Sequence, residues 1–323
     1  MTANSEQISA ARMIADLSRR VHESMSRVVS GKSEAIDATI MTLLAGGHLL
    51  IEDVPGVGKT TLASVLARSV EASVRRIQFT SDMLPTDVTG LSIYDQTSQK
   101  FRFHRGPVFA NVVIADEINR ATPKTQSALL EAMGENSVTV DGRTFALPEP
   151  FMVAATQNPQ DMEGTFPLPE AQRDRFMARI SLGYPDRDSE LLMLRARGSS
   201  DPARRVRAVA TTSEILESQR VIADIHVADD VSRYLVAIVS ATRSHPGIAL
   251  GASPRATLHL ARMARARAAM RGRSFVSPDD VAALAGIVLP HRLVARGRFS
   301  SVAESLAASG EIVSEIVART PVR

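Results

Sequence analysis

The sequence predicts an α/β protein with a parallel sheet flanked by helices, followed by an all-helical region. Strands alternate with helices from His48 to about Leu182, and a glycine-rich loop joins the first strand to a helix. From Tyr184 onwards the apolar residues follow helical spacing alone. The 323-residue chain is 44% hydrophobic, which is enough for a sizeable core.

The candidate strands of the sheet are short apolar runs separated by helical or turn-forming segments. They are His48–Ile51, Val74–Phe79, Asn111–Ala115, Phe151–Thr156 and Ala178–Leu182. Two hairpins are also expected. One pairs Ser137–Val140 with Thr144–Leu147 around Asp141-Gly142, and a shorter one pairs Leu91–Tyr94 with Lys100–Phe103.

Helical patterns lie on both sides of this alternation. Residues 5–29 predict a helix, and its expected apolar face is Ile8, Met13, Leu17, Val21 and Met25. Ser253-Pro254 and Ser277-Pro278 each read as an N-cap followed by proline at the first helical position. We therefore expect an N-terminal helix (1–30), an α/β core (31–185) and a helical domain (186–323), with residues 198–205 as a mobile loop.

Composition excludes several kinds of site. Cysteine is absent, so no disulfide, thiolate metal site or cysteine nucleophile exists. Aromatic residues are only 4%, tryptophan is absent and the net charge is +3, which argue against a nucleic-acid-binding protein. The N-terminus has no apolar signal core, and no run of 18 apolar residues would span a membrane. A cytoplasmic location is expected.

The most informative segment is the loop at residues 54–61, which reads Val-Pro-Gly-Val-Gly-Lys-Thr-Thr. Glycines let backbone N–H groups close around phosphate oxygens, and the following helix N-terminus favours an anion. Lysine then reaches the β- and γ-phosphates, and the next hydroxyl ligates Mg²⁺. Asp53 stands where the strict motif has its first glycine. The residues expected to contact ATP are Pro55, Gly56, Val57, Gly58, Lys59, Thr60 and Thr61.

A second motif is an apolar strand that ends in two adjacent acids, Asp116 and Glu117. Functional residues of parallel sheets lie at the carboxyl ends of the strands. Asp116 is expected to hold Mg²⁺ together with Thr60, and Glu117 to orient the water that attacks the γ-phosphate. Asn158, after the strand at 151–156, could hydrogen-bond the γ-phosphate or that water. The alternative for Asn158 is an Asx turn before Pro159.

These motifs, in this order, resemble AAA+ ATPases, and the longer segments resemble the MoxR family. The matching segments span roughly residues 5–320. They are 106–111, 116–121, 123–133, 166–172 and 251–255. The chain departs from the family pattern at Asp53 and at Gly134, where the family usually has an acid and where the approach to the following hairpin could change.

The resemblance implies further site residues. Asn158 matches sensor 1, Arg175 matches the arginine finger given to a neighbouring subunit, and Arg255 matches sensor 2. A guanidinium can stabilise the negative charge on the oxygens of a phosphoryl group during its transfer. The sequence alone does not show whether Arg175, Arg173 or Arg179 is the arginine finger. Because a cation in the first turn opposes the helix dipole, we expect an anion such as ATP beside Arg255.

The resemblance also implies two inserts, at about 83–110 within helix 2 and at about 135–150 as a pre-sensor hairpin. Both would face the axis of a ring, where Arg102, His104 and Arg105 could touch a partner or lie solvated. Another basic run is open to two interpretations, a solvated helix face or a DNA-phosphate contact. It consists of Arg262, Arg265, Arg267, Arg271 and Arg273.

The function implied by the resemblance is Mg²⁺-dependent ATP hydrolysis by a hexameric ring that remodels or matures a protein partner. In this family the partner is often a protein with a von Willebrand factor A domain, and metal-centre insertion is one role. Three rivals remain open: the motor subunit of a magnesium or cobalt chelatase, a DNA-linked ATPase, and a nucleotide-gated scaffold with little turnover. The adjacent acids Asp116 and Glu117 argue against the scaffold.

Overall fold

The computed structural model describes residues 2–158, 164–188, 190–191, 203 and 206–322. A five-stranded parallel sheet organises the first half, in the order β2-β5-β8-β1-β9. Its strands, within two residues of the expected bounds, are β1 (Leu49–Glu52), β2 (Val74–Gln78), β5 (Val112–Asp116), β8 (Met152–Gln157) and β9 (Ala178–Ile180). β1, β5 and β8 are buried along their whole length, as expected for strands covered on both faces.

Helices cover the sheet because the chain must cross over between parallel strands. The helices of this half are α1 (Thr2–Ser26), α2 (Ser33–Leu44), α3 (Lys59–Ser69), α4 (Pro85–Thr89), α5 (Pro123–Glu135) and α6 (Glu170–Arg173). α2 was not among the helices expected from the sequence. None of the helices that the structure describes is long and apolar enough to cross a membrane.

The expected face of α1 was wrong at one position. Met13 is 62% exposed, whereas Ile14 is buried with Leu17, Val21 and Met25. Residues spaced regularly by four move gradually off one face, because a helix has 3.6 residues per turn. The buried residues are spaced by three, four and four, which keeps them on one face. α1 packs against α10, α2 and α3, so it contributes to the main hydrophobic core.

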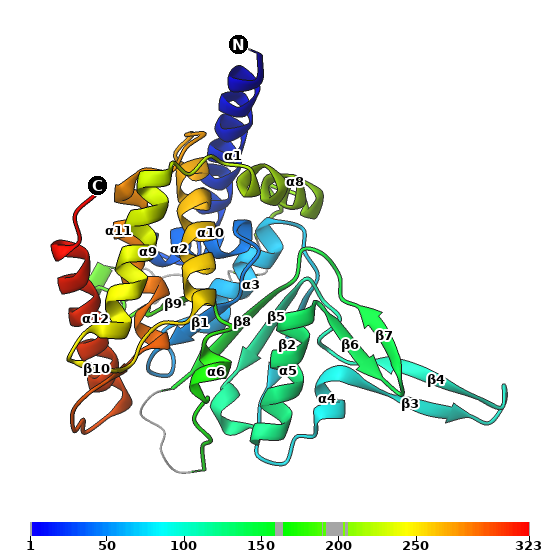
Figure 1. Ribbon diagram of the computed structural model, residues 1–323. Coiled ribbons are helices and arrows are strands. Elements are labelled where there is room, and N and C mark those ends of the chain that lie inside the picture. Colours follow the sequence, from blue (N-terminus) through cyan, green and yellow to red (C-terminus); the bar gives the residue numbers. More distant parts are fainter. Residues whose placement is uncertain (1, 159–163, 189, 192–202, 204–205, 323) are drawn as a thin grey trace.

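Helices dominate after residue 206. They are α8 (Thr212–Ala223), α9 (Asp229–Ser244), α10 (Pro254–Met270), α11 (Pro278–Val288) and α12 (Val302–Arg319), and they lie beside the sheet in Figure 1. The Ser277–Asp280 capping box and the Ser253 cap are present. The expectation of helix alone was incomplete, because β10 (Ile248–Leu250) pairs with β11 (Val294–Ala295). Strands of two or three residues are too short to show a period-two pattern. All of residues 198–205 except Ala203 lies outside the described residues.

Two antiparallel hairpins project from the sheet domain on the same side (Figure 1). They are β3 (Gly90–Asp95) with β4 (Lys100–Arg105), and β6 (Ser137–Val140) with β7 (Arg143–Ala146). The Phe103 and Phe145 rings stack with their centroids 4.3 Å apart, which joins the two hairpins. Phe101 at 73% and Tyr94 at 48% are exposed near the far end of the first hairpin.

Candidate ATP site and its arginine pocket

The glycine-rich loop has the backbone that a phosphate site requires. Gly56 and Gly58 have φ values of +83° and +94°, which L side chains rarely adopt. Gly58 is the N-cap of α3, so Lys59, Thr60 and Thr61 form the first helical turn with its unpaired N–H groups. The Lys59 ammonium lies at the loop and donates to the carbonyls of Asp53 and Gln157. These features fit a bound phosphate chain.

The structure gives Asp53 a structural role. Its Oδ2 accepts hydrogen bonds from the N–H groups of Leu182 and Gly183, both at 2.6 Å, and from the Ser181 hydroxyl at 2.8 Å. Oδ1 accepts from the Val54 N–H at 2.8 Å. Burial raises the pKa of Asp53, but these hydrogen bonds outweigh it and leave the pKa below its usual value. Asp53 thus ties the phosphate loop to the segment after β9.

The second motif lies beside the first turn of α3. The Thr60 hydroxyl donates to Oδ2 of Asp116 at 3.1 Å, and the Thr156 hydroxyl donates to Oδ1. Arg76 reaches the same Oδ2 through Nε at 3.0 Å and Nη2 at 2.6 Å. Burial raises the pKa of Asp116, yet hydrogen bonds from Thr156, Arg76 and Thr60 lower it overall. The carboxylate is therefore ionised at neutral pH.

Thr60 and Asp116 are a suitable donor set for Mg²⁺. Mg²⁺ normally takes one or two protein oxygens and completes its octahedron with phosphate and water. In the ranges that the structure covers, no three His, Cys, Asp or Glu side chains gather into a metal cage. The hydroxyl and the carboxylate lie at the position where the loop would hold the phosphates.

Glu117 is held in an unusual backbone conformation. Its φ and ψ are 55° and 50°, and its N–H donates to the Thr156 hydroxyl at 2.9 Å. Its carboxylate accepts from Gln78 Nε2 at 3.1 Å and lies 3.2 Å from the Arg120 guanidinium. A left-handed conformation of a non-glycine residue is a strained state that is common at functional sites.

Asn158 follows β8, between β5 and β1 in the sheet, so it belongs to the same carboxyl edge as Asp116 and Glu117. It is buried, and its carbonyl accepts from Asn119 Nδ2 at 3.4 Å. The alternative Asx turn involves Pro159, which lies outside the described residues.

Arg175 and Arg255 lie together, but in a different pocket. This pocket has a volume of about 640 Å³, and no residue of the 54–61 loop lines it. The Arg175 guanidinium donates to the Leu130 carbonyl in space left by Gly134, where a Cβ would approach Nη1 to 2.9 Å. The departure at Gly134 therefore affects Arg175 directly. Arg173 and Arg179 do not line the pocket and pair with Glu170 and Glu52.

The anion expected beside Arg255 is present in the protein itself. Asp174 accepts from the Ser253 hydroxyl at 2.9 Å and from Arg292 at 2.8 Å, and lies 3.9 Å from the Arg255 guanidinium. A carboxylate at the N-terminus of α10 compensates both the helix dipole and the first-turn cation. The position of Arg255 therefore does not by itself require ATP.

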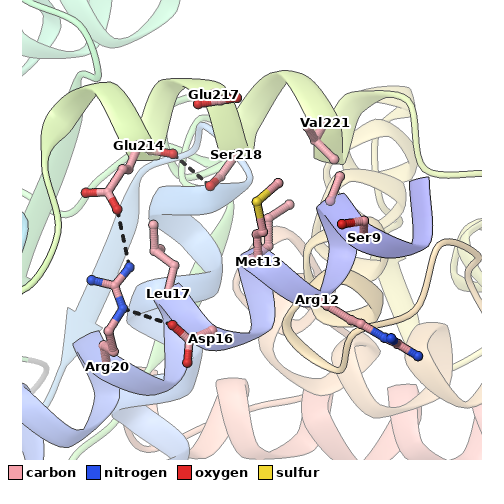
Figure 2. A pocket seen from close by; sticks show the side chains of 12 residues that line it. Ser9, Arg12, Met13, Asp16, Leu17, Arg20, Glu214, Glu217, Ser218 and Val221 are labelled. Atoms are coloured by element: carbon pink, nitrogen blue, oxygen red, sulfur yellow. Dashed lines mark hydrogen bonds and ion pairs between the residues drawn. The ribbon is translucent and has the colours of Figure 1, made fainter. Parts of the chain in front are cut away.

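A third pocket, of about 450 Å³, lies between α1 and α8. Figure 2 shows Arg20 bridging Asp16 and Glu214 at one end, with Met13 extending from α1 toward α8. Its lining carries charges of both signs, of which Arg20, Asp16 and Glu214 are paired, and it contains none of the motif residues. Because acidic and basic residues both line it, this gap between helices favours neither an anion nor a cation.

Three residues that contact the acids of the site were missed from the sequence. Arg76 and Gln78 on β2 contact Asp116 and Glu117, and Thr156 binds both of those residues. The available signal was two polar side chains two residues apart at the end of an expected strand. These side chains could be assigned to the site only if β2 were known to lie next to β5, where Gln78 pairs with Asp116.

Comparisons with known proteins agree with this geometry. Residues 48–178 match the model of the "ATPase family associated with various cellular activities (AAA)", and residues 240–316 match the AAA lid domain. Chaperone MoxR1 of Mycobacterium tuberculosis is 42% identical over 94% of this chain and 81% of its own length. The uncharacterised protein YeaC of Bacillus subtilis is 48% identical over 84% of this chain and 85% of its own.

A crystal structure of a candidate ATPase from Cytophaga hutchinsonii superposes with a TM-score of 0.88 at 35% identity. The match covers 98% of this chain and 97% of the other. The expected fold, a P-loop α/β core with a helical lid, is confirmed. The chain belongs to the MoxR family of AAA+ ATPases.

Proposed function

We propose that the protein hydrolyses ATP with Mg²⁺, as a ring of subunits that remodels a protein partner. The observation that carries this proposal is the 3.1 Å contact between the Thr60 hydroxyl and the ionised Asp116, directly beside Lys59 and the glycine-rich loop. Hydroxyl, carboxylate and ammonium are the groups needed to hold a magnesium triphosphate.

Each residue has a separate role in this proposal. Backbone N–H groups from Gly56 to Thr61 bind phosphate oxygens, and Lys59 neutralises the β- and γ-phosphates. Thr60 and Asp116 would hold Mg²⁺, which would supply charge neutralisation at the phosphate oxygens. Glu117 accepts a hydrogen bond from the attacking water and aligns it. Asn158 hydrogen-bonds that water or the γ-phosphate.

Assembly completes the site. Arg175 lies outside the pocket of its own P-loop, which supports a role on the ATP of a neighbouring subunit. A guanidinium supplied in this way stabilises the charge of the transition state. We expect six copies in the ring, as the family resemblance implies.

The partner is proposed to be a protein, because the relative MoxR1 is named a chaperone. The exposed Phe101, Tyr94 and Ile93 on the first hairpin offer apolar contacts, and Arg102 adds a cation there. A protein with a von Willebrand factor A domain is the partner class that we propose to test first.

The test of hydrolysis separates binding from chemistry. Lys59→Ala is expected to abolish ATP binding in calorimetry. Glu117→Gln is expected to bind ATP and lose about 10²- to 10⁴-fold in turnover, as for a lost proton-accepting group. Lys124→Ala, at an exposed lysine of α5, is the matched control and keeps both. Wild-type turnover in Glu117→Gln would overturn the mechanism.

A further inference from the structure

Four arginines line the 640 Å³ pocket beside α10, and no Asp or Glu is among its lining residues. Arg175 comes from the segment after α6, whereas Arg255, Arg262 and Arg265 come from one side of α10, spaced seven and three residues apart. Arg175 matches the arginine finger and Arg255 matches sensor 2. Arg262 and Arg265 have no assigned role.

The charges of this pocket are poorly compensated. In the part of the chain that the structure describes, Arg262 and Arg265 have no carboxylate within ion-pair distance, and Nε of Arg265 is buried without a hydrogen-bond partner. Asp174 lies 3.9 Å from Arg255, but it is shared with Arg292 at 2.8 Å. Clustered guanidiniums repel one another, and an anion that binds among them relieves this repulsion.

The nearby histidines respond to this charge. Burial, and then the charges of Arg175 and Arg262, lower the pKa of His48 to about 4. Burial, and then Arg292, Arg262 and Arg255, lower the pKa of His259 to about 2. Both rings are therefore neutral at physiological pH and add no cation, so the arginines alone set the positive potential of the pocket.

The rest of the basic run behaves differently. Arg267 and Arg273 pair with the buried Asp280 at 3.3 Å and 2.6 Å. Among the described residues, Arg267 of α10 therefore has a carboxylate partner, whereas Arg262 and Arg265, which line the pocket, have none. The interpretation of the whole run as one solvated face was wrong for Arg267, which is only 21% exposed.

We propose that Arg262 and Arg265 bind phosphate and, with Arg175 and Arg255, form one site for a triphosphate. Guanidinium forks match phosphate oxygens in geometry and remain charged. The anion must come from outside the chain's own P-loop, whose residues do not line the pocket. Two sources share this chemistry: the ATP held by a neighbouring subunit, and free polyphosphate. This inference rests on the proposed ATPase.

The first experiment tests the neighbouring ATP. Arg262→Gln and Arg265→Gln are compared with Arg271→Gln, an exposed arginine at the end of the same helix that does not line the pocket. Loss of a charge-assisted hydrogen bond costs about 1.5–3 kcal/mol, or roughly 10- to 100-fold. We expect ATP turnover to fall by that factor in the two pocket variants, with ATP binding to the P-loop unchanged by calorimetry. Adding Glu117→Gln subunits, which carry an intact pocket, is expected to restore part of the turnover.

The second experiment tests free polyphosphate. Inorganic tripolyphosphate is titrated into the Lys59→Ala chain, whose P-loop is disabled, with and without Arg262→Gln. Binding that weakens about 10-fold in the double variant would support the pocket as the site. Arg262→Lys, which keeps the charge but lacks the fork, is expected to bind with intermediate affinity and controls for misfolding.

The outcomes separate the two proposals. If the wild type hydrolyses no ATP, the proposed function fails, and tripolyphosphate binding still tests the pocket. If the wild type is active, Arg262→Gln and Arg265→Gln match Arg271→Gln in turnover, and Arg262→Gln leaves tripolyphosphate binding unchanged, the inference about the pocket is overturned and the ATPase stands.

Discussion

The P-loop corner and the arginine pocket are two regions of opposite character. The P-loop corner combines Lys59 and Thr60 with the carboxylates of Asp116 and Glu117, whereas the arginine pocket is lined by four guanidiniums and no carboxylate. The first suits a metal and an attacking water, and the second suits the anion alone. The arginine pocket lacks the carboxylates of the P-loop corner, and the arginines of that corner, Arg76 and Arg120, are paired with its own acids. This division is expected if two copies of the chain together form one complete site.

Their supports also differ. The P-loop corner is held by hydrogen bonds to carboxylates, above all those to Asp53 and Asp116. The arginine pocket lies over neutral buried histidines and backbone carbonyls. The two regions should therefore respond differently to substitution and to pH.

The largest expected effect concerns the complementarity of the two regions. Arg175→Ala should bind ATP normally and hydrolyse it about 10³-fold more slowly, because a trans arginine acts on the transition state. Mixing Arg175→Ala with Glu117→Gln subunits should restore some turnover at interfaces that pair two intact halves. Arg173→Ala, outside the pocket, is the matched control. Turnover that is independent of protein concentration in a monomeric sample would contradict a shared site.

The second prediction concerns the floor of the arginine pocket. His48 Nδ1 accepts from the Val153 N–H and Nε2 donates to the Met133 carbonyl, both at 3.0 Å. Because its folded pKa of about 4 lies below the usual 6.5, the unfolded chain takes up a proton first as the pH falls. His48 should thus lower the free energy of unfolding between pH 6.5 and 4, by about 3 kcal/mol in total.

Urea unfolding at pH 7.5 and pH 4.5 measures this effect. His48→Asn should be less stable at pH 7.5, through lost packing, yet lose less stability on acidification than the wild type. His104→Asn, at an exposed histidine on the first hairpin, is the control. The same pH dependence in His48→Asn and in the wild type would show that the buried ring is not its source.

The smallest expected effect concerns the P-loop side. Asp53→Gly restores the glycine of the strict motif but removes the acceptor for Leu182, Gly183 and Ser181. The free energy of unfolding should fall by about 2 kcal/mol, since hydrogen bonds to a charged group are lost. Because the pKa of Asp53 is lowered, its contribution exists above the usual value of 3.8 and disappears as the pH falls below it.

Asp53→Asn, which keeps one acceptor oxygen without the charge, should lose less stability than Asp53→Gly in the same urea titration. ATP binding should persist in both variants, since the loop backbone needs only Gly56 and Gly58. If Asp53→Gly were as stable as the wild type, the structural role of Asp53 would be contradicted.

Local patterns were enough to predict much of the ATP site. The sheet strands, both hairpins and the caps at Ser253 and Ser277 each depend on residues close in sequence, so spacing and turn chemistry predicted them. The proximity of Thr60 and Asp116 was also predicted, because parallel strands and the P-loop helix bring their functional ends to one edge.

Contacts between distant segments were decided by the tertiary structure. Arg76 and Gln78 reach the acids of β5 only because β2 is the neighbour of β5, and an alternating pattern of strands and helices does not give strand order. Met13 was assigned to the core because a regular four-residue spacing resembles a helical face, although Ile14 is the residue that is buried.

The sequence by itself determined the phosphate loop, the paired acids and the family, since these depend on residue types at short fixed spacings. Only the tertiary structure decided that Arg175, Arg255, Arg262 and Arg265 share one pocket, that Asp174 compensates Arg255, and that Asp53 ties the loop to the segment after β9. The physical reason is that charges interact through distance in space, and folding brings Asp53 against a residue 130 positions away.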